Sequence, residues 1–392
     1  MIRLFINGLA ASAGGGLTYL RNVIPHLAQR GDTETTVLLN PAMRAEFGKL
    51  PNIALIKDRA PHGAAHRFIR EQATLPKLIR RSGAQVLIAA GNFALWRSPV
   101  PQILLSRNSL YTSSDFSRDI RTRGDYSIWA DTLFKGCLAR QSINRADITV
   151  APSAAFAKEL SEWSGRKVLA VHHGFDPGGF TSDATPLSAD VQRLLDQEKD
   201  ALRLLFVSHY NYYRNFETLF RAMPILGNRL RGRKVKLFLT CRLNSGENPG
   251  VYRAESAASL ANDLRGGHDI VELGTIPYHS LHHLYRACHI YVTPAYAESF
   301  AHPLIEAMSS GLPVVASDLP VHREICGDAG IYFPRFSPEG LAERVLEIQQ
   351  SPESREDLAR NGLRRARDFS WSAHVDCLIA LAQELVRSER KD

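Results

Sequence analysis

Two glutamates separated by seven residues are the feature of this sequence that points most directly to chemistry. Glu298 and Glu306 lie in the stretch ESFAHPLIEAMSSGLPVVASDLP, residues 298–320. We expect a strand at 290–293 and a helix from Pro303, which puts Glu306 one turn inside that helix. Both carboxylates can then point to one place and accept hydrogen bonds from the vicinal hydroxyls of a sugar and a ribose. The alternative is two unrelated surface glutamates.

The backbone between the two glutamates offers a second kind of contact. Ser299 lies there, and the N–H groups of Phe300, Ala301 and His302 open the expected helix. The first N–H groups of a helix have no partner inside it, and the helix dipole favours negative charge at that end. This segment can therefore face the diphosphate of a nucleotide.

A second loop, at 208–215, carries polar residues between an expected strand and an expected helix from Phe216. It contains Ser208, His209, Arg214 and Asn215. A guanidinium just before a helix N-terminus suits a pyrophosphate, because arginine offers a fixed bidentate geometry and the helix dipole adds to its charge. The alternative is a surface arginine paired with Glu217.

A glycine run in the first half is the third candidate contact. Gly14, Gly15 and Gly16 precede the expected helix Leu17–Gln29. Glycine lets the backbone approach a phosphate or a sugar closely. The spacing is not that of a dinucleotide-binding G-x-G-x-x-G turn, and a flexible loop without a ligand is an equal alternative.

Strand-like and helix-like segments alternate along the chain, which is typical of βα units. In the first half we expect strands at Ile2–Asn7, Thr35–Leu39, Ile53–Lys57, Val86–Ala89, Ile103–Ser106, Ile148–Ala151 and Val168–His172. In the second half we expect them at Leu202–Ser208, Val235–Thr240, Ile270–Leu273, Ile290–Thr293, Val314–Ala316 and Ile331–Phe333. The expected helices include His66–Arg81, Ser153–Trp163, Phe216–Ile225, Leu281–Ala287 and Pro303–Ser310, with more between Pro338 and Arg387.

These elements predict two Rossmann-like, doubly wound parallel-sheet domains. The Gly-, Pro- and Ser-rich stretch at 172–190 has the composition of a linker. The predicted division is 1–175, 176–370 and a C-terminal helix at 371–392 that crosses back to the first domain. Because ligands bind beyond the carboxyl ends of parallel strands, we expect the site in a central cleft between the two domains.

Charge is divided unevenly between the two halves. The 392 residues carry a net charge of +8, but residues 1–175 contain 23 Lys and Arg against 12 Asp and Glu. A basic first half suits a phosphate-bearing acceptor or an anionic membrane surface, and helix 66–81 is one candidate contact, with a merely solvated basic face as the alternative. No nucleic-acid-binding motif is present. Five cysteines without a C-x-x-C pair, and no apolar run or N-terminal leader pattern, predict a cytoplasmic protein that is at most peripheral at the membrane.

The sequence resembles the retaining glycosyltransferases of family 4, which have the GT-B fold. The resemblance rests on E-x7-E with the following AMSSGLPVVAS run, on GTIPYHSLHHLYRACHIYVTPAYAESF before it and on PVHREICGDAGIYF after it. HHGFD at 172–176 lies where the family usually reads P-N-G-V-D. The likeness is dense from about Phe206 to Phe333 and thin before Val150.

The resemblance implies a role for each candidate residue. Glu306 would bind the donor ribose and Glu298 the hydroxyls of the transferred sugar, while Arg214 and His209 would neutralise the diphosphate. Ser208, Asn215, Ser299, Gly15, Gly16 and the backbone of Phe300–His302 would complete the donor site. The implied reaction is transfer of a hexose from GDP-mannose or a UDP-hexose to a glycan or lipid-linked acceptor in polysaccharide biosynthesis, with retention and without a metal or other cofactor.

Two positions depart from the family pattern. The family usually has a Gly-Arg pair and a later Lys where this chain has Ser208, His209 and Arg214. Many members have a His-Asp pair where this chain has Arg107 and Asn108, which we place on the acceptor side of the cleft together with Trp96, Arg97 and Tyr111. The two-domain architecture leaves a nucleotide-sugar epimerase as one alternative, against which the E-x7-E segment argues. The departures leave a second alternative, a non-catalytic sugar-nucleotide or glycan binding protein of the same fold. His279, His282 and His283 have a spacing that could bind a metal, but an ordinary helix is the better interpretation.

Overall fold

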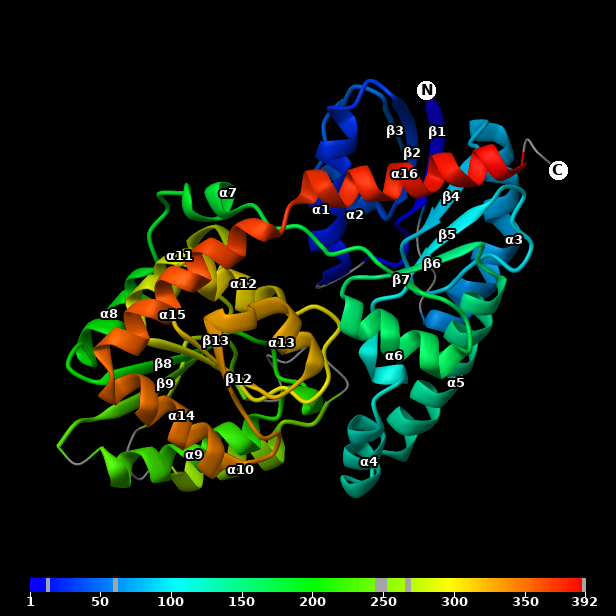
Figure 1. Cartoon of the computed structure of the whole chain (residues 1–392). Coiled ribbons are helices and arrows are strands. Elements are labelled where there is room, and N and C mark those ends of the chain that lie inside the picture. Colours follow the sequence, from blue (N-terminus) through cyan, green and yellow to red (C-terminus); the bar gives the residue numbers. More distant parts are fainter. Residues whose placement is uncertain (12–14, 59–62, 231, 244–251, 265–268, 390–392) are drawn as a thin grey trace. The chain divides into compact units, whose positions relative to one another are not determined.

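The computed structural model describes residues 1–11, 15–58, 63–230, 232–243, 252–264 and 269–389 (Figure 1). The chain divides into two compact units. Unit 1 comprises residues 1–112, 130–174 and 370–392, and unit 2 comprises residues 113–129 and 175–369. Residues 113–129 thus belong to unit 2, whereas the sequence-based range 1–175 assigned them to the first domain.

Unit 1 is built on a parallel sheet of seven strands in the order β3-β2-β1-β4-β5-β6-β7. The strands are β1 (Ile2–Asn7), β2 (Thr33–Leu39), β3 (Ile53–Lys57), β4 (Val86–Ala89), β5 (Gln102–Leu105), β6 (Ile148–Ala151) and β7 (Leu169–Ala170). Its helices are α1 (Gly15–Ala28), α2 (Pro41–Ala45), α3 (Ala64–Ser82), most of α5 (Tyr126–Arg145), α6 (Ala154–Ser164) and α16 (Trp371–Glu389), with the 3₁₀ turn η1 (Ser109–Tyr111). The strand order reverses between β1 and β4, which is the switch point of a doubly wound sheet.

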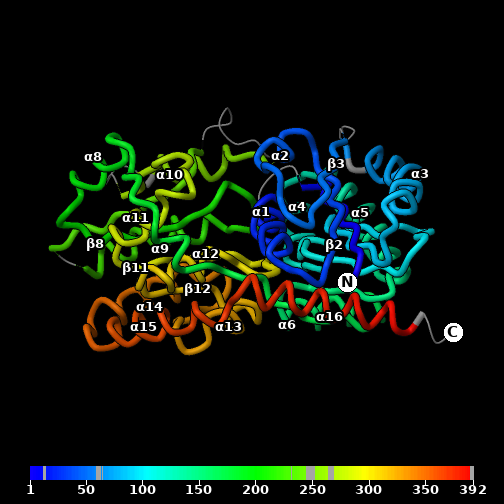
Figure 2. The backbone as a smooth tube through the Cα atoms, turned by 90° about the horizontal axis from the view of Figure 1, so that it is seen from above, coloured from blue at the N-terminus to red at the C-terminus, as the bar shows by residue number. Residues whose placement is uncertain are grey.

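Helix α16 belongs to the core of unit 1 although it comes last in the chain (Figures 1 and 2). Trp371, Val375 and Ile379 are buried together with Leu20 and Val23 of α1. Gly174 lies against the first residue of this helix, since a Cβ atom there would be only 2.1 Å from the Trp371 nitrogen. No other residue fits at this crossing without a backbone shift.

Unit 2 is built on a second parallel sheet, of six strands in the order β10-β9-β8-β11-β12-β13. The strands are β8 (Leu202–Phe206), β9 (Val235–Leu239), β10 (Ile270–Glu272), β11 (Ile290–Thr293), β12 (Val314–Ser317) and β13 (Gly330–Phe333). Helices lie on both sides of these strands (Figure 2). The helices assigned to unit 2 are α4 (Ser114–Thr122), α7 (Pro177–Thr181), α8 (Ala189–Gln197), α9 (Phe216–Arg229), α10 (Glu255–Leu264), α11 (Tyr278–Ala287), α12 (His302–Ser309), α13 (Pro320–Cys326), α14 (Pro338–Gln350) and α15 (Pro352–Arg365), with the 3₁₀ turns η2 (Tyr212–Arg214), η4 (Gly327–Ala329) and η5 (Ala366–Asp368).

The predicted strands are confirmed, with shifts at some ends. The largest difference is β7, which was expected over Val168–His172 and pairs only at Leu169–Ala170, as an edge strand does when the chain leaves the sheet. The predicted linker 172–190 is also not continuous coil, because it contains α7. Asp176 caps that helix by accepting a hydrogen bond from the Gly179 N–H, and proline occupies its first turn, a pairing that favours a helix start.

Candidate functional site

Arg214 and Glu298 meet at the switch point of the second sheet. Strands β8 and β11 are neighbours in that sheet and run parallel. Arg214 ends η2, which follows β8, and Glu298 lies in the loop that follows β11. Because the carboxyl ends of parallel strands lie at one edge, the two side chains come together, and they form an ion pair between Nη1 and Oε1. The pair is sheltered, with 21% of the arginine and 10% of the glutamate side chain exposed.

Asn215 holds the two loops of this pair together. It adopts the left-handed conformation with φ 56°, which asparagine tolerates better than most residues. Its Nδ2 donates to the Pro294 carbonyl at 3.1 Å, and its Oδ1 accepts from Thr218 Oγ1 at 2.9 Å. The backbone adds a second link, since the Tyr296 N–H donates to the Tyr213 carbonyl at 3.0 Å. The side chain predicted to bind the donor thus has both polar groups engaged inside unit 2.

Glu306 lies on α12, where its side chain is buried rather than open. Only 6% of the residue is exposed, and burial raises the pKa of its carboxyl to about 7. Tyr285 of α11 donates a hydrogen bond to Oε2 at 2.9 Å, which favours the charged form and offsets part of that effect. The carboxyl therefore has one defined partner, which the sequence gave no means of pairing with it.

A residue in the left-handed conformation directly precedes α12. The helix begins at His302, and no side chain caps it. Ala301 has φ 65° and ψ 63°, a left-handed conformation that costs an L-residue about 1–2 kcal/mol. Phe300 is buried, with its ring 5.7 Å from that of Phe369. The first turn of α12 is the end of that helix at which the helix dipole favours negative charge.

Ser208 and His209 lie in the same loop as Arg214 but do not join the ion pair. The Ser208 N–H donates to Thr240 Oγ1 at 3.0 Å, and Ser208 Oγ donates to the His209 carbonyl at 2.8 Å. His209 is exposed. Among the contacts of the described residues, none connects its imidazole with Arg214 or Glu298, so its predicted role stays a prediction.

In unit 1, Arg107 lies beside the start of α1. A Cβ atom on Gly16 would be 3.9 Å from Arg107 Nη2, and the guanidinium lies 4.7 Å from the centre of the Tyr19 ring. Nη2 donates to the Ala90 carbonyl, whereas Nη1 is buried without a hydrogen-bond partner. Arg107 forms no ion pair in the part of the chain that the structure describes, and burial lowers its pKa.

Two other predicted residues near this place have different environments. Asn108 caps η1, since its Oδ1 accepts from the Leu110 N–H at 3.1 Å. Gly15 is exposed at the first position of α1, and Gly14 lies outside the described residues. The structure thus brings Gly16 and Arg107 together, while Asn108 shapes the following turn.

Sequence reasoning missed several buried ionisable residues, among them Glu71 and His322. Glu71 of α3 accepts a hydrogen bond from Asn7 Nδ2 at 3.2 Å, and burial raises its pKa to about 7. His322 of α13 is fully buried with Nδ1 2.8 Å from the Ser317 carbonyl, and burial lowers its pKa to about 4. Glu71 lies in a helix rich in arginine and lysine, so nothing in the sequence indicated that this one carboxyl is buried.

The histidines of α11 do not form a metal site. Among the described residues, no group of three or more His, Cys, Asp or Glu side chains could hold a metal ion. His282 and His283 stack with their ring centres 3.9 Å apart, and His282 also lies 5.9 Å from the Phe180 ring. These contacts place His282 in ordinary helix packing.

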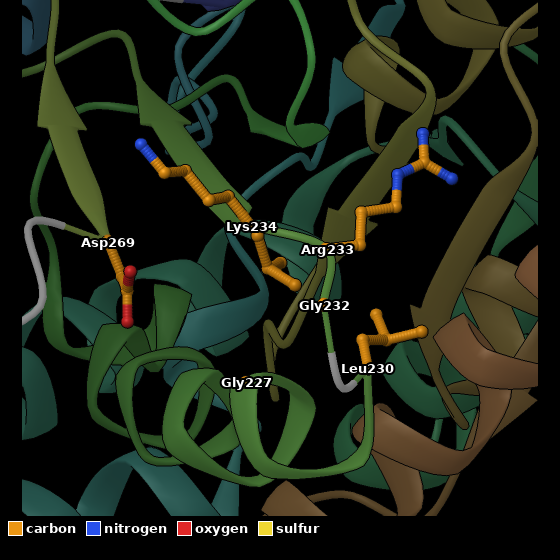
Figure 3. Close-up of a pocket in the computed structure, with 7 residues that line it drawn as sticks. Gly227, Leu230, Gly232, Arg233, Lys234 and Asp269 are labelled. Atoms are coloured by element: carbon orange, nitrogen blue, oxygen red, sulfur yellow. The ribbon is translucent and has the colours of Figure 1, made fainter.

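A hollow of about 400 Å³ lies at the other end of the second sheet (Figure 3). It is lined by Gly227, Leu230, Gly232, Arg233, Lys234, Val235 and Asp269. Val235 begins β9, so the hollow is at the amino ends of the strands, away from Arg214 and Glu298. Arg233 and Lys234 point to different sides of it, and they do not converge on one ligand (Figure 3).

Two models of known protein families match this chain. Residues 13–178 match the model described as Glycosyltransferase Family 4, and residues 191–365 match the model described as Glycosyl transferases group 1. The chain belongs to the family 4 glycosyltransferases. Both halves of the chain therefore carry the family relationship, including the first half, where the resemblance by motif was thin.

Individual relatives are more distant. The D-inositol 3-phosphate glycosyltransferase of Actinosynnema mirum is 31% identical over 261 residues, which is 64% of this chain and 61% of that protein. The O-antigen chain mannosyltransferase B of Escherichia coli is 36% identical over 99 residues, which is 25% of this chain and 26% of that protein. The chain thus matches less than two thirds of the length of these relatives.

Solved structures show the GT-B fold over the whole chain. A sucrose-phosphate synthase from Thermosynechococcus elongatus has a TM-score of 0.79 at 18% identity and covers 99% of this chain and 100% of its own. Anabaena HepE, solved in complex with UDP-glucose, has a TM-score of 0.69 at 16% identity over 100% of both chains. The predicted fold class is confirmed. None of the described helices is long and apolar enough to cross a membrane.

Proposed function

We propose that this glycosyltransferase moves a hexose from a nucleoside-diphosphate sugar to its acceptor with retention of configuration. The observation that carries the proposal is the Arg214–Glu298 ion pair at the switch point between β8 and β11. In doubly wound sheets this is the place where a nucleotide binds. An arginine and a helix N-terminus can neutralise the charge of a diphosphate, and a carboxylate can accept hydrogen bonds from the hydroxyls of a sugar.

The ion pair itself defines how the site would work. Before the donor binds, Glu298 neutralises Arg214 inside a sheltered site. The donor's diphosphate would take over Arg214 and release the Glu298 carboxylate to the sugar hydroxyls. As the glycosidic bond breaks, negative charge grows on the leaving diphosphate, and Arg214 with the first N–H groups of α12 would stabilise it there. This scheme needs no metal or other cofactor.

The acceptor side is proposed from charge. Residues 1–175 have a net charge of +11, and Arg107 in that half forms no ion pair among the described residues. We infer that the acceptor bears phosphate, as a lipid-linked or phosphorylated glycan of cell-surface polysaccharide synthesis does, and that unit 1 approaches an anionic membrane from its cytoplasmic side. Relatives named as a mannosyltransferase and a neighbour solved with UDP-glucose support GDP-mannose and UDP-hexoses as the donors to try first.

Thermal unfolding with UDP, GDP, ADP, dTDP and CMP in turn, with EDTA throughout, tests the donor site. A nucleotide at a hundred times its Kd stabilises the native state by about 2.7 kcal/mol, which is readily measured. We expect one nucleotide to stabilise the wild type, to act less on Glu306→Ala, and to act fully on Glu347→Ala, a control at a half-exposed position of α14.

Turnover is then measured with the corresponding sugar nucleotide, and release of the nucleoside diphosphate is followed. A protein that binds the nucleotide but never releases it from the sugar donor, with any acceptor mixture, would be a binding protein of the same fold. Stabilisation that is absent with EDTA and appears when Mg²⁺ is supplied in its place would contradict the metal-independent scheme.

A further inference from the structure

Residues 113–129 leave unit 1 and fold as part of unit 2. They contain α4, and the residues on either side, up to Thr112 and from Ala130, belong to unit 1. Ser113 caps α4 by accepting a hydrogen bond from the Phe116 N–H at 3.1 Å. One short helix, α4, thus belongs to unit 2 although it lies in the sequence between β5 and β6 of the first sheet.

The apolar side of α4 is completely buried in unit 2. Phe116 and Ile120 both have 0% exposure. The Phe116 ring lies 6.2 Å from that of Tyr213 and 6.3 Å from that of Tyr252, in edge-to-face geometry. Aromatic pairs of this kind add to the stabilisation that burial provides. The helix is thus packed against the residue that immediately precedes Arg214 in its loop.

The polar side of α4 contacts both loops of the site. Asp119 accepts a hydrogen bond from Tyr296 Oη at 2.6 Å and another from Arg123 Nε at 2.8 Å. Arg123 Nη1 in turn pairs with Glu217 of α9 at 2.9 Å, and its guanidinium lies 4.2 Å from the Tyr212 ring centre. These groups are largely buried, so the pairs are shielded from solvent.

A turn after α4 adds one more contact. Gly124 has φ 73°, a conformation that L-residues rarely adopt, and it returns the chain toward unit 2. Asp125 then accepts a hydrogen bond from Tyr212 Oη at 2.6 Å and pairs with Arg253. Tyr212 and Tyr213, the two residues before Arg214, are therefore both held by the 113–125 segment.

We propose that Asp119 and Arg123 are positioning residues that set the relative placement of Arg214 and Glu298. Tyr296, which Asp119 holds, is two residues before Glu298, and its N–H joins the Tyr213 carbonyl. The segment of α4 and Arg123 thus contacts both loops that carry the ion pair, through Tyr296 in one and Tyr212 and Tyr213 in the other. The catalytic consequence rests on the proposed function, whereas the holding of the two loops does not. A displacement of 1 Å can lower a rate by roughly a hundredfold.

The test uses the full-length protein and three variants. Tyr296→Phe removes only the hydroxyl that donates a hydrogen bond to Asp119. Arg123→Gln removes the positive charge of that side chain, and Arg123→Lys keeps the charge but lacks the forked guanidinium that can bind two carboxylates at once. Arg121→Gln is the matched control, because in the described part of the chain this exposed side chain of α4 hydrogen-bonds only within its own helix, to the Ser117 carbonyl. Amide hydrogen exchange is followed by mass spectrometry, and nucleoside diphosphate release is measured with UDP-glucose and with GDP-mannose.

We expect Tyr296→Phe and Arg123→Gln to speed exchange several-fold in residues 208–215 and 294–301, while unit 1 and the Arg121→Gln control exchange like the wild type. The kcat for the active donor should fall roughly tenfold with its KM within about threefold, because a transition-state contact is misplaced, and Arg123→Lys should recover part of it.

Unchanged exchange in both loops of folded Tyr296→Phe and Arg123→Gln would overturn the proposal, whether or not either donor is turned over. Faster exchange with an unchanged kcat would overturn it as well, because the loops would then move without consequence for the reaction. A wild-type protein inactive on both donors would count against the proposed function, and the exchange result would still decide whether α4 holds the loops.

Discussion

Each unit has an arginine side chain near the switch point of its sheet, but Arg214 follows β8 and Arg107 follows β5, and their partners differ. In unit 2, Arg214 follows β8 and meets Glu298 at the switch point between β8 and β11. In unit 1, Arg107 lies near the switch point between β1 and β4, where its Nη2 donates to the Ala90 carbonyl, and it forms no ion pair among the described residues. One site is electrically balanced until a ligand enters, whereas the other keeps a cation whose Nη1 has no hydrogen-bond partner. The comparison indicates that the sheet topology determines where these side chains meet, whereas the neighbouring residues determine whether the charge of the arginine is balanced.

The buried glutamates of the two units are, by contrast, alike. Burial raises the pKa of Glu71 in unit 1 and of Glu306 in unit 2 to about 7 in each case. Glu71 is held by Asn7 and faces Arg67, while Glu306 is held by Tyr285. Each carboxyl lies on a helix beside its sheet. The two units thus differ in the partners of their arginines, whereas each has a buried helix glutamate whose pKa is raised to about 7.

The largest effect should come from removing each arginine in turn. Arg214→Met leaves Glu298 sheltered and unpaired, so we expect a loss of about 3 kcal/mol in the free energy of unfolding and a roughly 10²–10³-fold loss of turnover. Arg107→Met removes a cation that pairs with no carboxylate among the described residues, so we expect a change within about 1 kcal/mol. Urea unfolding and donor turnover measure both.

Arg221→Met, at an exposed position of α9, is the control for the loss of a positive charge. Equal destabilisation by Arg214→Met and Arg107→Met would contradict the contrast between the two units. It would mean that the contacts of Arg107 with the Ala90 carbonyl and the Tyr19 ring stabilise unit 1 as much as the Arg214–Glu298 ion pair stabilises unit 2.

The pH dependence of stability should sharpen the likeness between the glutamates. Because burial raises the pKa of Glu306 from 4.5 to about 7, the native protein binds its proton more tightly than the unfolded chain does. Stability from this group is therefore complete below about pH 4.5 and is lost as the pH rises through 7, by about 3 kcal/mol. Glu71 should contribute the same sign over the same window.

Urea unfolding of the wild type, Glu306→Gln and Glu71→Gln at pH 5 and pH 8 measures these contributions. Each variant should lose less stability than the wild type between the two values, because glutamine keeps a hydrogen-bond acceptor without a charge. Glu347→Gln, at a half-exposed position, should follow the wild type. If Glu306→Gln loses as much stability as the wild type, its carboxyl is already charged at pH 5 and is better solvated than its burial indicates.

The smallest effect concerns the start of α12. Ala301 has φ 65°, so Ala301→Gly should stabilise unit 2 by about 1 kcal/mol. Ala73→Gly, at an exposed position inside α3 of unit 1, should destabilise by a similar amount, because glycine costs entropy in a regular helix. Thermal unfolding of both variants compares the two signs, and a loss of stability in Ala301→Gly would show that its methyl group packs usefully.

Much of the candidate site could be predicted because its residues follow strands that can be recognised in the sequence. Alternating apolar runs define strands such as β8 and β11, and parallel strands necessarily end at one edge. Residues that follow those strands, Arg214 and Glu298, are therefore brought to one side of the sheet by connectivity alone. Their types and positions, together with the family resemblance, were sufficient to propose a nucleotide-sugar site.

Other side-chain contacts around the candidate site could be found only from the tertiary structure. Asp119 and Tyr296 are 177 residues apart, and no periodicity or motif relates α4 to the loop after β11. The same holds for Glu306 with Tyr285 and for Glu71 with Asn7, whose hydrogen bonds depend on how helices pack against the sheets. Sequence order determines which segments become strands and helices, because that choice is made within a few residues. Which side chains are buried together depends on contacts between distant segments, and those exist only once the chain has folded.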